Sequence, residues 1–150
     1  MGDIYFYSHN KPYGELSNFW RSPFVLDGLE WPTVEHYFQA QKTTDLAKRE
    51  RIRKAQTPAL AKQLGHSVCS RPDWKEVKED IMLKALHAKF SQNPDLAEVL
   101  LDTGDNRLHE DSPHDQYWGV KGKDRLGKLL EQVREEIRRE QSFGANAVYR

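Results

Sequence analysis

The hydrophobic residues of this chain recur mainly at the spacing of an α-helix. The widest apolar pattern lies in residues 73–91, where Trp74, Val77 and Ile81 begin one stripe and a second stripe runs beside it. A helix that is apolar over such a width is expected to be largely buried. A narrower stripe, from Leu126 to Ile137, predicts an amphipathic last helix.

Three shorter helices are indicated by their end signals. Residues 46–55 form a charged helical segment. Thr57-Pro58 has the chemistry of an N-cap and a first helical position, and Gly65 that of the residue just past a helix end. Asn93-Pro94 and Gly104 bracket another helix in the same way.

Strand signals are few and lie near the N-terminus. Residues 4–7 have high β propensity, and residues 24–31 read as a hairpin because Asp27-Gly28 favours a type I′ turn. We therefore expect an α+β, predominantly helical fold with a small antiparallel sheet built from residues 4–7 and 23–31. Strands and helices do not alternate, which argues against a doubly wound parallel sheet. Residues 105–124 show no periodicity and are expected to form a long, functional loop.

Length and composition narrow the class of protein. The 150 residues suit one domain, predicted at residues 1–140, followed by a tail at 141–150. Lys and Arg total 23, as do Asp and Glu, so a general nucleic-acid coat or a membrane-surface protein is not expected. Cys69 is the only cysteine, which excludes an intrachain disulfide. No signal peptide or membrane span is visible, so a soluble cytoplasmic protein is expected; oligomeric state is not readable.

The segment WPTVEHYFQAQK, residues 31–42, combines an apolar face with aligned polar groups. Thr33 suits the N-cap of a short helix. On that helix Glu35 and Lys42, seven positions apart, nearly coincide, with Gln39 beside them. Such a pair is either a solvated surface ion pair or a group of reacting side chains on an anchored helix.

The order of residues in four segments resembles the NADAR superfamily. The four are YGELSNF at 13–19, WPTVEHYFQAQK at 31–42, IMLKALHAKF at 81–90, and DQYWG followed by GKDRLG at 115–127. They occur in the order found in that family and span about residues 4–140. The resemblance implies N-glycosidase activity. No HExxH or similar metal-binding spacing is present, and we expect no cofactor and no metal.

Cleavage of a C–N glycosidic bond builds positive charge on the ribose, so a nearby carboxylate is needed. Glu35 and Asp115 are the carboxylates set among aromatic residues rather than in charge runs; the alternative for Asp115 is a loop cap or Asx turn. Lys42, desolvated among aromatics, could attack the sugar C1 as an amine or serve as a plain cation. Glu35, Lys42 and Asp115 are the candidate catalytic residues.

The remaining candidates are expected to bind substrate. Aromatic rings could stack on the base, polar groups could hold the ribose, and cations between glycines could bind phosphate, although GVKGK is not a P-loop. The resemblance implies an active-site tryptophan at Trp74 and an acidic residue at Glu110. Trp74 equally suits the helix core. The candidates are Ser17, Asn18, Gln39, Trp74, Glu110, Tyr117, Trp118, Gly119, Lys121, Lys123 and Arg125.

Two substrate classes follow from the resemblance. Some members cleave ribosylated pyrimidine intermediates of riboflavin biosynthesis and release ribose 5-phosphate. Others remove ADP-ribose from guanine, which would bring local contact with modified nucleic acid. The sequence does not choose between these partners, and a non-catalytic module that binds NAD or ADP-ribose is the alternative.

Overall fold

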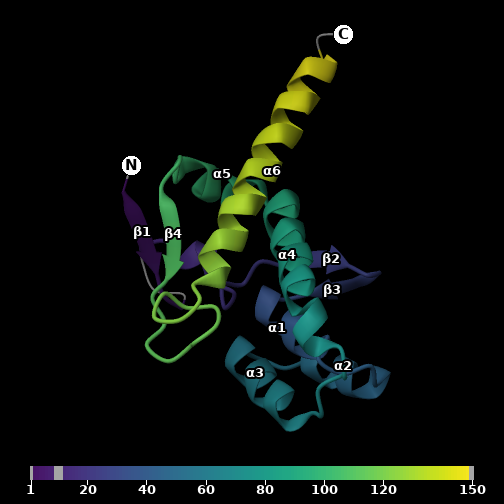
Figure 1. Ribbon diagram of the computed structural model, residues 1–150. Helices are drawn as coiled ribbons and strands as arrows, with labels where there is room; N and C mark the ends of the chain where they lie inside the picture. The colour runs from purple at the N-terminus through teal and green to yellow at the C-terminus, as the bar shows by residue number, and fades with distance from the viewer. Residues whose placement is uncertain (1, 9–11, 149–150) are drawn as a thin grey trace. The chain divides into compact units, whose positions relative to one another are not determined.

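The computed structural model describes the backbone of residues 2–8 and 12–148, and the side chains of these residues as far as Phe143. Within that part of the chain there are six α-helices, one 3-10 helix and four short strands (Figure 1). The α+β, predominantly helical class is confirmed. The chain divides into two compact units, Asn18–Lys89 and Met1–Ser17 with Phe90–Arg150, and each is described by itself.

The predicted hairpin is present in the unit Asn18–Lys89. Strands β2 (Phe24–Leu26) and β3 (Leu29–Trp31) pair antiparallel, and they form the small antiparallel element expected near the N-terminus. Asp27 and Gly28, with φ of 55° and 79°, make the turn in the left-handed conformation that the Asp-Gly pair accommodates.

The same unit contains three short helices and most of a long one. Helices α1 (Val34–Ala40), α2 (Leu46–Arg53) and α3 (Pro58–Ser67) precede α4 (Trp74–Gln92). Thr57 caps α3 as predicted, because its side chain accepts a hydrogen bond from the Leu60 N–H. The prediction that Gly65 follows the end of this helix is wrong: α3 continues to Ser67.

An aromatic cluster anchors α1 to the hairpin. The ring of Tyr37 lies 5.0 Å from that of Trp31 and 6.4 Å from that of Phe24, centroid to centroid. Its hydroxyl donates to Asp27 at 2.6 Å, and Lys84 binds the other oxygen of that carboxylate at 2.8 Å. The apolar face of α1, predicted from the segment at residues 31–42, is therefore packed in the core.

The other unit is built around a parallel strand pair. Strand β1 (Asp3–Phe6) pairs with β4 (Arg107–Glu110) in parallel register, Asp3 opposite Arg107 (Figure 1). The expectation that residues 4–7 join the hairpin in one antiparallel sheet is wrong, and so is the expectation that 105–124 is loop throughout. The strand predicted at residues 4–7 is present as β1, within one residue. Its partner β4 carries too little periodicity to be found, and the pairing is set by tertiary contacts.

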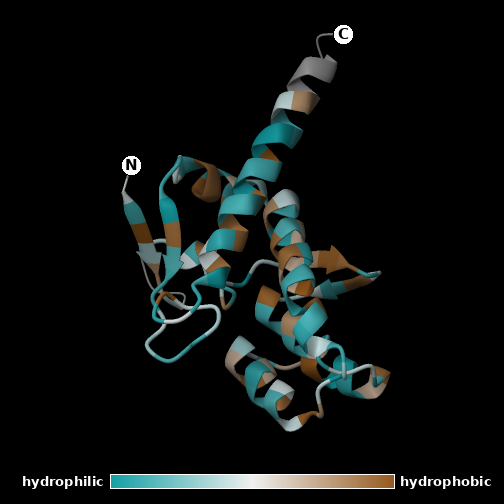
Figure 2. Ribbon diagram, in the orientation of Figure 1, coloured by the Kyte–Doolittle hydropathy of each residue, from teal (hydrophilic) through white to brown (hydrophobic). Residues whose placement is uncertain are grey.

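Helices α5 (Pro94–Asp102) and α6 (Arg125–Val148) complete this unit, together with the 3-10 helix η1 (Gly14–Leu16). An apolar stripe follows the first turns of α6, which packs on β4 and α5 (Figure 2). Helix α6 continues through most of the predicted tail at 141–150; residues 149–150 lie outside the described part. The boundary between domain and tail stays a prediction.

Candidate active site

Buried hydrogen bonds fix the start of α1. The Thr33 hydroxyl accepts from the His36 N–H at 3.1 Å and lies 2.8 Å from His36 Nδ1, while Nε2 lies 3.0 Å from the Ala55 carbonyl. That carbonyl can only accept, so Nε2 carries the proton. Burial lowers the pKa of His36, which favours the neutral ring. The side chain therefore holds the start of α1 in place by its two hydrogen bonds rather than acting as an acid.

Glu35 and Gln39 form a buried pair on α1. Their exposed fractions are 7% and 3%, and Gln39 Nε2 donates to Glu35 Oε2 at 2.6 Å. The Glu35 N–H donates to the Asn18 carbonyl at 3.1 Å, which ties the candidate Asn18 to the same helix. Glu35 is thus no solvated surface carboxylate, which was the competing interpretation of its position.

Lys42 lies just beyond α1 rather than on it. The helix ends at Ala40 with Gln41 as its C-cap, so the prediction that Glu35 and Lys42 share one helix is wrong in that detail. The Lys42 carbonyl accepts from the Arg71 N–H at 2.7 Å, a contact that helical periodicity does not contain.

The charge of Glu35 nevertheless affects the pKa of Lys42. Burial lowers the pKa of Lys42, the charge of Glu35 partly raises it again, and Lys62 lowers it further. The net direction, which the sequence left open, is downward. A lowered pKa increases the share of neutral amine, which is the form that can act as a nucleophile.

Two residues of α3 belong to this group and were not found from the sequence. Burial lowers the pKa of His66, and the charges of Lys42 and Lys62 lower it further. Helix α3 packs against α1, which brings Lys62 and His66 within electrostatic range of Lys42. Because Lys62 and His66 are four positions apart, the sequence places them on the same face of their helix. It does not show that this face packs against α1.

Trp74 and Asn18 lie in the same unit. The Trp74 ring, half-buried at the start of α4, is 5.0 Å from that of Phe38 and tilted by 56°, so it serves at least in part as packing. The Asn18 amide donates to Met82 Sδ at 3.5 Å. Its Oδ1 is buried without a hydrogen-bond partner in the structure.

Asp115 adopts the loop-capping role that its sequence position allowed. Its Oδ1 accepts from the backbone N–H groups of Tyr117 and Trp118 at 2.9 and 2.7 Å. This Asx-type turn orients the two aromatic residues, whose rings meet edge to face at 4.8 Å. A catalytic role for Asp115 stays a prediction.

Backbone contacts close the loop after β4. The Val120 N–H donates to the carbonyl of Glu110, the last residue of β4. A side chain at Gly119 would come within 2.9 Å of the Asp115 carbonyl, so this glycine is required by the turn. Lys123 Nζ lies 5.4 Å from the centre of the Tyr117 ring.

The candidates therefore fall in both compact units. Asn18, Glu35, Gln39, Lys42 and Trp74 belong to Asn18–Lys89, and the rest to the other unit. Their convergence on one cleft stays a prediction. Among the described residues, no group of three or more His, Cys, Asp and Glu side chains is placed to hold a metal ion.

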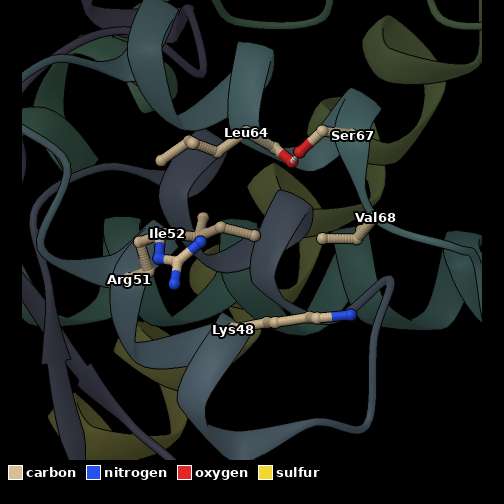
Figure 3. Close-up of a pocket in the computed structure, with 6 residues that line it drawn as sticks. All are labelled: Lys48, Arg51, Ile52, Leu64, Ser67 and Val68. Carbon is tan, nitrogen blue, oxygen red and sulfur yellow. Dashed lines mark hydrogen bonds between the residues drawn. The ribbon is translucent and has the colours of Figure 1, made fainter.

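A hollow between α2 and α3 contains none of the candidate residues (Figure 3). Its lining combines basic, apolar and hydroxyl side chains and does not include the Glu35–Gln39 pair. The residues that line it are Lys48, Arg51, Ile52, Leu64, Ser67 and Val68.

Comparison with known proteins identifies the family. The NADAR domain model matches residues 5–138, nearly the whole chain. The chain belongs to the NADAR family. The resemblance of its four motifs to that family is thereby confirmed.

Relatives of this NADAR protein cover most of its length. The N-glycosidase YbiA of Escherichia coli (strain K12) is 46% identical over 140 residues, covering 89% of this chain and 88% of the relative. The NMR structure of that protein matches with a TM-score of 0.85, covering 94% of this chain and 89% of that chain. An N-glycosidase of Nostoc punctiforme is 46% identical over 146 residues, covering 90% and 92% of the two chains.

A third relative is a riboflavin biosynthesis protein of Vibrio vulnificus. It is 38% identical over 140 residues, which cover 89% of this NADAR chain and 38% of the relative.

Across the described residues, none of the helices combines the length and the apolar character that crossing a membrane requires.

Proposed function

We propose that this protein is an N-glycosidase that hydrolyses the C–N bond between a ribose and an amino-substituted base. The observation that carries the proposal is the buried Glu35, held by Gln39, within electrostatic range of Lys42, whose pKa is lowered. The family and the names of its relatives support the activity. A module that only binds NAD or ADP-ribose would not need this combination of carboxylate and amine.

Lys42 is the proposed nucleophile. Its neutral amine forms a bond to ribose C1 as the C1–N bond to the base breaks, and the departing amine takes a proton. The ring oxygen then leaves C1 and takes up the remaining proton of the lysine nitrogen, which gives an imine on Lys42. Water then adds to C1 and releases ribose and the free lysine, so the net reaction consumes one water. Glu35 stabilises the positive charge that develops at C1.

Borohydride trapping tests this role. Reduction during turnover should leave a permanent sugar adduct on Lys42, detected by mass spectrometry. Lys42→Arg should abolish both adduct and turnover, because arginine offers no accessible neutral amine. Lys48→Arg, at an exposed lysine of α2, is the matched control. If the Lys42→Arg variant turns over normally and no adduct forms, Lys42 is not the nucleophile. The reaction then proceeds by direct attack of water on C1, assisted by Glu35 or Asp115.

For the substrate, we propose a ribosylated pyrimidine of riboflavin biosynthesis, with ribose 5-phosphate as a product. The name of the Vibrio vulnificus relative supports this class. ADP-ribosylated guanine, free or in nucleic acid, is the competing substrate. It shares the ribosylated amine but carries a diphosphate and adenosine beyond the ribose. A release assay with both compounds side by side decides, and preferential release of guanine would refute the pyrimidine assignment.

The other candidates take binding roles in this proposal. Trp74, Tyr117 and Trp118 stack on the base or ribose. Ser17, Asn18 and Glu110 contact hydroxyl groups. Gly119 shapes the loop, and the cations after it bind the phosphate: Lys121, Lys123 and Arg125. A cytoplasmic location accords with an intermediate of biosynthesis as substrate.

A further inference from the structure

Gly65 lies inside helix α3, where glycine is unfavourable. Two residues follow it before the helix ends at Ser67. Glycine in a helix loses more conformational freedom on folding than any other residue. Its backbone is not in the left-handed region; among the described glycines only Gly28 and Gly104 are. The reason for a glycine at this position is therefore space.

The space beside Gly65 is filled by the side chain of Gln39. A methyl group at Gly65 would lie 2.0 Å from Gln39 Oε1, 2.8 Å from Cδ and 2.9 Å from Cβ. Rotation of the amide about the Cγ–Cδ bond moves Oε1 but leaves Cδ and Cβ in place, so it does not make room. A side chain at residue 65 would therefore force Gln39 into another rotamer and shift it away from α3.

Any movement of the Gln39 side chain would disturb its hydrogen bond to Glu35. Its Nε2 donates to Glu35 Oε2 at 2.6 Å, and both side chains are more than nine-tenths buried. A carboxylate only accepts hydrogen bonds, so the NH₂ group must face Glu35 and Oε1 must face α3. Oε1 has no hydrogen-bond partner in the structure. The amide thus faces Gly65 on one side and the carboxylate on the other.

We propose that Gly65 is a positioning residue for Glu35: because it has no side chain, Gln39 can hold the carboxylate in the orientation that the reaction uses. This inference rests on the proposed N-glycosidase function. It assigns Gly65 no contact with substrate. Its effect passes through Gln39, so it should vanish when the Gln39 amide is removed.

A double-mutant cycle tests the proposal. Gly65→Ala should lower kcat at least ~10-fold and change KM less than ~3-fold, because Glu35 is displaced from its reactive geometry. In a Gln39→Ala background, the same change at residue 65 should have a much smaller effect, because the clashes with Oε1 and Cδ are gone and only the 2.9 Å contact with Cβ remains. Gln63→Ala, exposed on α3, is the control for altered helix propensity. Equal losses in both backgrounds would overturn the proposal.

A second measurement does not depend on activity. With ¹³C-labelled glutamate, the titration midpoint of the Glu35 carboxyl should move to higher pH in Gly65→Ala, because the ionised form loses its donor. The same substitution should not move it in the Gln39→Ala background. If the Glu35 midpoint shifts in Gly65→Ala but the wild-type protein releases no base, the link from Gly65 through Gln39 to Glu35 is supported. The proposed N-glycosidase function would then be refuted.

Failure to fold is also informative. If Gly65→Ala lowers the melting temperature sharply and Gln39→Ala restores it, the contact with Gln39 is the cause, as proposed. If the Gly65→Ala, Gln39→Ala double variant is equally unstable, the Gln39 amide is not the cause of the instability, and the positioning role is wrong.

Discussion

Removing the charge of Glu35 should slow turnover by a factor that its burial determines. Two unit charges about 4 Å apart interact by about 1 kcal/mol in water, but by about 4 kcal/mol at the effective dielectric of a protein site. With 7% of Glu35 exposed, the second value applies. Glu35→Gln should therefore lower kcat at least ~100-fold, and up to ~1000-fold, because each factor of ten requires about 1.4 kcal/mol.

The fold should survive this substitution. Glutamine keeps an oxygen that can accept from Gln39 Nε2, so the free energy of unfolding should fall by no more than about 2 kcal/mol. Steady-state release of the base gives kcat and KM, and circular dichroism gives the melting curve. Glu30→Gln, an exposed carboxylate on β3, is the matched control and should be near wild type. A folded Glu35→Gln variant within tenfold of wild-type kcat would refute an essential charge.

Three further predictions concern stability. The pKa of Lys42 is lowered in the fold, so the folded state disfavours its charge; Lys42→Met should raise the melting temperature at neutral pH, and a lower value would contradict this. The pKa of His36 is also lowered, so the unfolded chain gains its proton first. Stability should fall as pH drops below about 6.5, and His36→Gln should flatten that dependence in melts between about pH 7 and about pH 5. A methyl group at Gly127 would lie 1.6 Å from the Leu108 carbonyl oxygen, so Gly127→Ala should cost at least about 3 kcal/mol in denaturant unfolding; a smaller loss would show that β4 and α6 can separate cheaply.

The features that sequence predicted well are those fixed by neighbours in the chain. The Asp27-Gly28 turn follows from residues that tolerate positive φ, and the start of α3 follows from the cap of Thr57 and the proline after it. Each depends on interactions within a few positions, which a local pattern contains.

The features that sequence missed depend on distant partners. Lys42, beyond the end of α1, accepts a hydrogen bond from Arg71, and the space beside Gly65 inside α3 is filled by Gln39. Lys62 and His66 read as ordinary surface residues until α3 packs on α1. Their roles are set by which faces meet, and periodicity within one helix does not specify its partner.

The pairing of β1 with β4 bears on the order in which the chain folds during synthesis. Strand β1 is made first but must wait for a partner about 100 residues later, which at a translation rate of 5–20 residues per second takes roughly 5–20 s. The stretch Asn18–Lys89 has its strand partners within itself and can fold as it leaves the ribosome. Strand β1 therefore stays without its partner over that interval, whereas β2 and β3 can pair as soon as both have been made.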